Sequence, residues 1–167
     1  DNVIIKNRKF GSLACLLSHC LLWDKIYNHE PGKIFLIFED DCYLDNNFKQ
    51  QCITYLEFLP DDWDMVWLGY NNFLGYDVGN IFNKPLNLKK DVLLPFFRLF
   101  GTNAEHHCYL INKDSIPKIK NLFFPYNGEK TKDIIMRENF HKFNAYFLFK
   151  KLAFQDTINL PSYRKSS

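Results

Sequence analysis

The sequence has no long apolar run, no large excess of charge of either sign and no Cys-x-x-Cys pair. No apolar stretch approaches the roughly 20 residues that a membrane-spanning helix needs, so we expect no transmembrane segment. The formal net charge is only +2 and the lysines are scattered. Because phosphate binding requires a concentrated basic face, this distribution argues against nucleic acid as a partner. Neither a signal peptide nor a transit peptide is visible.

The cysteines are five in number, an odd count without any Cys-x-x-Cys pair: Cys15, Cys20, Cys42, Cys52 and Cys108. This spacing is unlike that of a zinc site or a disulfide framework. We therefore expect buried free thiols in a reducing compartment, which favours the cytosol, with the secretory lumen as the alternative. The bias toward Asn, Lys, Ile and Phe would suit an AT-rich genome, either bacterial or viral.

What is present is enough apolar material for one folded domain. The chain has 167 residues, of which 47% are hydrophobic and 17% aromatic. Helical periodicity predicts helices within residues 11–32, 46–60, 113–124 and 129–143, the first of them capped by Ser12. Extended apolar patterns predict strands within 33–38, 62–69, 92–102, 106–112 and 144–154. This alternation favours a single α/β domain, residues 1–167, with a mostly parallel sheet flanked by helices. The apolar run at 33–38 is typical of a strand buried on both faces.

Three adjacent acids, Glu39, Asp40 and Asp41, follow that strand directly. Ligands of open α/β sheets bind beyond the carboxyl ends of the strands. Glu39 and Asp41 are two residues apart and can turn the same way, and oxygen ligands on a short loop suit Mn²⁺ or Mg²⁺. The alternative interpretation is a solvated turn whose acids cap the next helix. This alternative stays open because short sequence motifs often occur by chance.

Four segments resemble, in order and spacing, glycosyltransferase family 25: GSLACLLSHCLLWDKI, IFLIFEDDCYL, FLPDDWDMVWLG and GTNAEHHCYLINKDSIPKI. That family includes bacterial lipopolysaccharide galactosyltransferases and procollagen galactosyltransferases. Its pattern is a Gly-x-x-x-Cys-x-x-Ser-His helix, a strand ending in Glu-Asp-Asp and an Asp-hydrophobic-Leu-Gly strand. The match runs from about Phe10 to Asn112, and more loosely to the FQDTINLPSYR segment.

The resemblance implies a GT-A-like fold, a UDP-hexose donor, a divalent metal and an inverting transfer of galactose or glucose. The acceptor hydroxyl would belong to a glycan, a lipid-linked sugar or a protein. By the same resemblance, the metal ligands would be Glu39 and Asp41. The donor-binding residues would be Ser18, His19, Glu39, Asp40, Gly101 and Thr102. From periodicity alone, His19 is instead interpreted as a buried core histidine hydrogen-bonded to backbone.

An inverting transfer needs one general base to deprotonate the acceptor hydroxyl. Family members carry a further acid before a helix that begins with hydrophobic residues, and Asp133 stands in the comparable place. Glu105 is the rival base. The alternative interpretation of Asp133 is an ordinary acid in the first turn of a helix, where the helix dipole favours it.

The chain also departs from the family pattern. The family normally begins with a strand carrying an Asn-Leu-Asp-Arg-like segment that contacts the nucleotide, and this chain begins too late to contain it. That departure supports a second hypothesis, a non-catalytic module that binds carbohydrate or another protein. The three crowded acids oppose it, because a module without a ligand has no physical need of them. A third hypothesis, another metal-dependent phosphoryl-transfer enzyme, is weakened by the lack of a Gly-rich phosphate loop.

Overall fold

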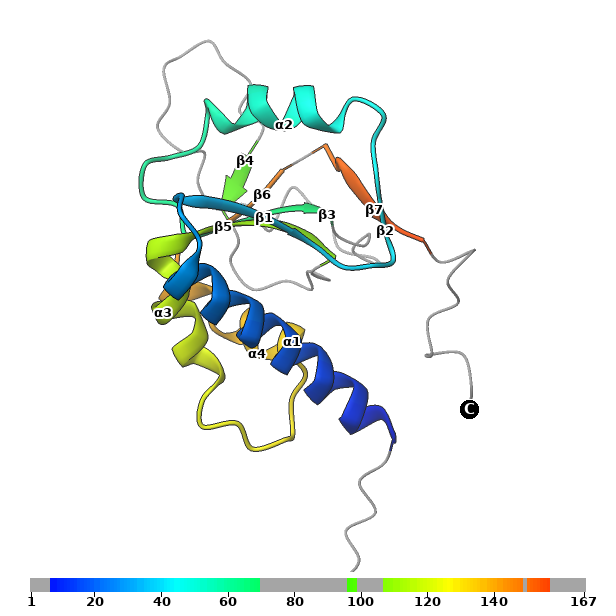
Figure 1. The fold of residues 1–167 in the computed structure, drawn as a ribbon, viewed down its shortest axis with the longest axis vertical. Helices are drawn as coiled ribbons and strands as arrows, with labels where there is room; N and C mark the ends of the chain where they lie inside the picture. The colour runs from blue at the N-terminus through cyan, green and yellow to red at the C-terminus, as the bar shows by residue number, and fades with distance from the viewer. Residues whose placement is uncertain (1–6, 70–95, 99–106, 149, 157–167) are drawn as a thin grey trace, which may run out of the picture.

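The protein is described by a computed structural model over residues 7–69, 96–98, 107–148 and 150–156. A seven-stranded mixed sheet lies at its centre, with helices on both faces (Figure 1). Its strands are β1 (Ile34–Phe38), β2 (Cys42–Leu44), β3 (Met65–Gly69), β4 (Phe96–Arg98), β5 (Cys108–Asn112), β6 (Ala145–Leu148) and β7 (Ala153–Gln155). The helices are α1 (Asn7–His29), α2 (Phe48–Leu56), α3 (Ile116–Lys120) and α4 (Lys132–Glu138), with short 3₁₀ turns at η2 (Lys113–Ser115), η3 (Asn121–Phe123) and η4 (Phe140–Lys142).

The strand order corrects the prediction of a mostly parallel sheet. The order is β1-β5-β3-β6-β4, with β7 paired to both β2 and β3. Only the β3–β6 and β3–β7 pairings of the described strands are parallel, and the others are antiparallel. Strand β1 lies at the edge, where Ile34, Leu36 and Phe38 are 48%, 38% and 53% exposed. An unbroken apolar run identifies a strand but does not distinguish a central position from an edge. This is why the prediction that the strand at 33–38 is buried on both faces was wrong.

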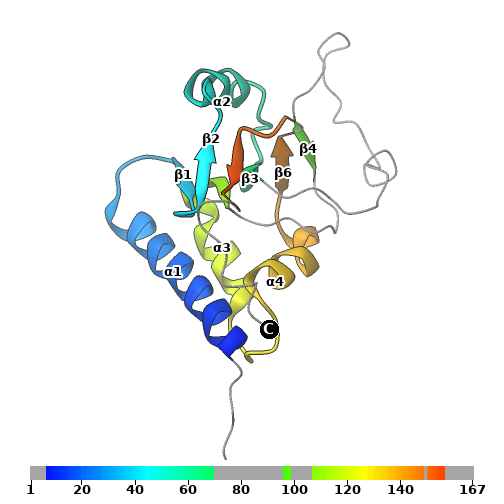
Figure 2. The ribbon, with the colours of Figure 1, turned by 90° about the vertical axis from the view of Figure 1, so that its right-hand side faces the viewer.

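Each face of the sheet buries its own core. Side chains alternate along the strands, so Trp67 and Tyr109 face α1, α3 and α4, whereas Val66 and Leu110 face α2. Figures 1 and 2 show α2 alone on one side and the other helices together on the opposite side. The core that contains Trp67 and Tyr109 therefore holds α1 and α4 on the same face of the sheet.

Helix α1 follows its predicted pattern but begins earlier than predicted. The helix starts at Asn7 rather than at the Ser12 cap, so Gly11 lies inside it. A single glycine inside a helix costs only about 1 kcal/mol, which a long packed helix tolerates. The helix ends at His29, before Pro31 as predicted, and buries Leu16, Cys20, Trp23 and Ile26. Of the described helices, none has the length and apolar character needed to cross a membrane.

The predicted strand at 144–154 is two strands, β6 and β7, and β2 was not predicted. The chain leaves the sheet at Lys150, which is exposed, and returns when the backbone N–H of Leu152 donates to the carbonyl of Leu68 at 2.9 Å. Strand β7 then pairs with β2, which follows the turn that carries Glu39, Asp40 and Asp41, here called the acidic turn. This return brings the end of the described chain next to Asp41.

Candidate active site

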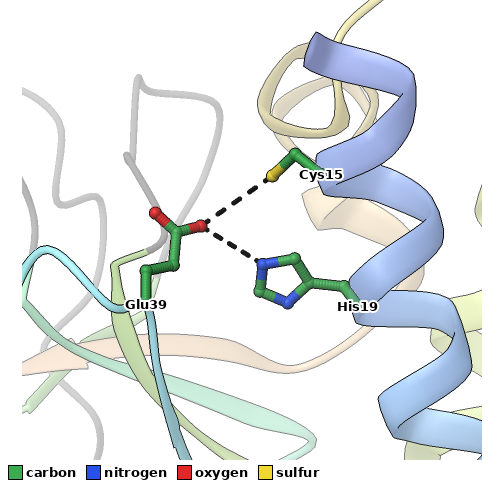
Figure 3. A group of neighbouring side chains, drawn as sticks. All are labelled: Cys15, His19 and Glu39. Carbon is green, nitrogen blue, oxygen red and sulfur yellow. Dashed lines mark hydrogen bonds and ion pairs between the residues drawn. The ribbon is translucent and has the colours of Figure 1, made fainter. Parts of the chain in front are cut away.

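Helix α1 and the end of β1 bring together residues that are far apart in the sequence. Cys15 and His19 lie one turn apart on α1, and Glu39 follows β1 with its backbone N–H donating to the carbonyl of His107 at 2.8 Å. Oxygen Oε1 of Glu39 lies 3.2 Å from Nε2 of His19 and 3.9 Å from Sγ of Cys15. Figure 3 shows both α1 side chains pointing at this one carboxylate oxygen. Helix α1, which carries the Ser-His pair of the family pattern, therefore contacts the acidic turn.

A lysine that sequence reasoning missed lies inside this group. Lys132, the first residue of α4, is only 4% exposed. Its Nζ lies 2.7 Å from Nε2 of His19 and 3.1 Å from Oε1 of Glu39. Lysine is among the residues least often fully buried, so its position in a helical first turn predicts exposure rather than this contact.

Both ring nitrogens of His19 have close polar partners. Nε2 faces the ammonium of Lys132, which can only donate, and the carboxylate of Glu39, which can only accept. Nδ1 lies 2.7 Å from the hydroxyl oxygen of Tyr109, to which the indole nitrogen of Trp23 donates at 3.0 Å. Burial lowers the pKa of His19, and the opposing effect of Glu39 does not outweigh it. The imidazole is therefore neutral at pH 7.

Glu39 is ionised despite its partial burial. Burial raises its pKa, but contact with His19 and the charge of Lys132 act in the opposite direction, and together they lower the pKa to about 2. Burial is also the main influence on Cys15 and raises its pKa, so that side chain is a neutral thiol. The group thus combines one carboxylate, one ammonium, one neutral imidazole and one thiol.

The two remaining acids of the turn differ in their surroundings. Asp40 is exposed, whereas Asp41 is held by β7. Its Oδ2 accepts from the side-chain amide of Gln155 at 2.7 Å, and its carbonyl accepts from the backbone N–H of Asp156 at 2.6 Å. Its Oδ1 is buried and has no hydrogen-bond partner among the described residues. A buried carboxylate oxygen with open lone pairs is suited to a cation, so Asp41 fits the predicted metal.

The other predicted residues lie at different distances from this group. Asp133 follows Lys132 in the first turn of α4, and its charge raises the pKa of both Cys15 and His19, although burial is the larger influence on each. Ser18 is exposed and donates to the carbonyl of Cys15 at 2.8 Å, so the structure does not bring it to Glu39. The remaining predicted residues, Gly101, Thr102 and Glu105, lie outside the described part of the chain.

Comparison with known proteins bears on this site. The family described as glycosyltransferase family 25 (LPS biosynthesis protein) matches residues 6–136, a range that contains His19, the acidic turn and Asp133. This match confirms the resemblance found in the sequence. No curated protein matches the chain.

One solved structure that resembles the chain is the crystal structure of A197 from STIV, with a TM-score of 0.50. The sequence identity is 17%, and the alignment covers 84% of this chain and 66% of that one. The chain thus spans just under two thirds of that protein. At this identity the similarity concerns the fold alone.

Proposed function

Because the chain belongs to glycosyltransferase family 25, we propose that it transfers a hexose, galactose or glucose, from a UDP-sugar to an acceptor hydroxyl. The observation that carries the proposal is the meeting of the Ser-His helix and the Glu-Asp-Asp turn, where His19 lies 3.2 Å from Glu39 across 20 residues of sequence. A GT-A-like arrangement, in which the donor binds beyond the end of β1, is part of the proposal.

The proposed metal, Mn²⁺ or Mg²⁺, would be held at the acidic turn. Asp41 supports this position because its buried Oδ1 has no hydrogen-bond partner in the described residues, and Asp40 beside it is exposed. Oε1 of Glu39 is already engaged by Lys132. When bound, such an ion neutralises charge that develops on the departing diphosphate.

Asp133 is the proposed general base. Its carboxylate would take the proton from the acceptor hydroxyl as that oxygen attacks the anomeric carbon and the bond to the diphosphate breaks. Attack from the face opposite the diphosphate inverts the anomeric configuration. The location of Asp133 supports this role, because it follows Lys132 and lies close enough for its charge to raise the pKa of Cys15 and of His19. Glu105 stays the rival.

The proposal is tested by measuring UDP release from UDP-galactose and UDP-glucose with Mn²⁺, in the presence of sugar, lipid-linked and peptide acceptors. We expect one donor to be consumed and a product of inverted anomeric configuration to form. Asp133→Asn should lower kcat by about 10²- to 10⁴-fold, the usual contribution of a general base. Glu138→Gln is the matched control, because Glu138 is an exposed acid of the same helix.

Two outcomes would contradict the proposal. Acceptor binding without UDP release under any of these conditions would favour a non-catalytic carbohydrate-binding module. Unchanged turnover in Asp133→Asn would transfer the role of base to Glu105.

The compartment is also a proposal. All five cysteines are free thiols in the structure. Unpaired thiols are usual in a reducing environment, so we propose that the protein acts in the cytosol. Cell fractionation with an epitope-tagged chain would test this directly.

A further inference from the structure

Lys132 carries a charge in a place where a charge is costly. The side chain is 4% exposed and lies next to Trp23, Met65, Tyr109 and Met136. Removing an ammonium group from water costs several kcal/mol unless other groups compensate. The chain therefore has to supply partners for this charge.

Those partners form a constellation that resembles a metal site. The ligand atoms of Cys15, His19 and Glu39 all lie within 4.8 Å of one another. Sulfur, imidazole nitrogen and carboxylate oxygen are together the donor set of Zn²⁺ and Co²⁺. The ammonium of Lys132, however, already lies 2.7 Å from His19 Nε2 and 3.1 Å from Glu39 Oε1.

We propose that Lys132 is the resident cation of this constellation, with its ammonium in the place that a metal ion would otherwise take among Cys15, His19 and Glu39. Glu39 is then an anchor for Lys132 and not a ligand of the donor's metal, which falls to Asp41. Two acids of the Glu-Asp-Asp motif thereby have different partners. Glu39 pairs with the ammonium of Lys132, and Asp41 binds the metal ion of the donor.

The same contact positions α4. Because Lys132 and Asp133 are adjacent in the first turn of that helix, the contact of Lys132 with Glu39 ties Asp133 to the acidic turn. Lys132 is thus a positioning residue for the general base. This last step rests on the proposed function, whereas the occupancy of the constellation does not.

The first test is cobalt binding, which needs no enzymatic activity. Co²⁺ held by a thiolate shows a charge-transfer absorption, so it reports on Cys15. We expect none from the unmodified protein, a clear band in Lys132→Ala, and loss of that band in Lys132→Ala with Cys15→Ser. A Cys15-dependent band in the unmodified protein, or no band in a Lys132→Ala variant that unfolds cooperatively, would overturn the proposal.

The second test also covers the case in which Lys132→Ala does not fold. Lys132→Met keeps the packed stem, and Glu39→Gln removes the opposite charge. Each change alone should lower the urea midpoint, and the double variant should lower it by clearly less than the two shifts together, because no uncompensated charge stays buried. Additive shifts would contradict the pairing.

A matched control pair lies on the surface nearby. Lys130 and Glu138 form an ion pair at 2.6 Å, with side chains 46% and 45% exposed. Lys130→Met and Glu138→Gln should each leave the urea midpoint almost unchanged, since exposed ion pairs contribute little. A coupling as large as that of Lys132 and Glu39 would show that burial is not the cause.

The positioning role has its own measurement. Lys132→Met should lower kcat more than it changes the KM for the UDP-sugar, and Lys132→Arg should restore part of the loss. An unchanged kcat in Lys132→Met would overturn the positioning role. If the unmodified protein releases no UDP at all, the proposed function fails, while the cobalt and urea measurements still decide the occupancy.

Discussion

Replacement of Glu39 by glutamine probes the buried ion pair with almost no change in shape. The glutamine can still accept a hydrogen bond from Lys132, but it cannot neutralise the ammonium. In the folded protein the pKa of Glu39 falls from 4.5 to about 2. One pKa unit corresponds to about 1.4 kcal/mol, so this lowering corresponds to about 3 kcal/mol of stability at pH 7. Because the side chain is 29% exposed and partly screened by solvent, we expect about 2 to 3 kcal/mol.

The sign of the pH dependence follows from the direction of that shift. A carboxyl group whose pKa is lower in the folded state stabilises the fold above its unfolded pKa, and this stabilisation is lost as the pH falls through the folded value. The difference in stability between the unmodified protein and Glu39→Gln should therefore be full near pH 7. It should begin to decrease near pH 4.5 and approach zero near about pH 2.

Urea unfolding followed by tryptophan fluorescence measures this difference, because Trp23, Trp63 and Trp67 are all buried. Subtracting the curve of the variant from that of the unmodified protein at each pH isolates Glu39 from other titrating groups. A difference below about 0.5 kcal/mol at pH 7, the usual size of a surface substitution, would refute the reasoning. A difference that stays constant down to about pH 3 would refute it as well.

Two further substitutions test the packing around the site. Tyr109→Phe removes the hydroxyl that hydrogen-bonds to the buried ring nitrogens of Trp23 and His19, so it should cost about 1 to 3 kcal/mol in thermal unfolding, and an unchanged Tm would contradict the network. Gly69→Ala would bring a Cβ to 2.5 Å from His107 and 2.8 Å from the carbonyl of Ala153, so it should destabilise the fold by about 1 to 3 kcal/mol. Gly11→Ala is its control, because that Cβ meets nothing within 4 Å and should stabilise α1 by about 0.5 to 1 kcal/mol.

The local structure was largely readable from the sequence, whereas the sheet was not. The apolar spacing in α1 predicts one face made of Leu13, Leu16, Leu17, Cys20, Trp23 and either Ile26 or Tyr27. Leu16, Cys20, Trp23 and Ile26 are buried as predicted, whereas Leu17 and Tyr27 are exposed. The antiparallel direction of β1 depends instead on its pairing with β5, whose paired residues lie 70 to 78 positions later in the chain. No pattern within an all-apolar strand of five residues reports that partner.

The candidate site divides in the same way. The order of the Ser-His helix and the Glu-Asp-Asp turn, through the resemblance to the family, indicated that His19 and Glu39 belong to one site, and the structure brings them together. Lys132 could not be identified, because its burial is produced by the packing of α4 against α1. The only signal in the sequence was its position next to Asp133, and a lysine there usually faces solvent.

The donor site is the central claim, and calorimetric titration of UDP, UDP-galactose and UDP-glucose into the protein tests it most directly, with Mn²⁺ and then with EDTA. We predict binding that requires Mn²⁺ and disappears in Asp41→Ala. Asp61→Ala, which changes an exposed acid before β3, should bind as the unmodified protein does. Binding of no nucleotide by the folded protein, or metal-dependent binding that survives in Asp41→Ala, would contradict the claim that the acidic turn holds the donor through its metal.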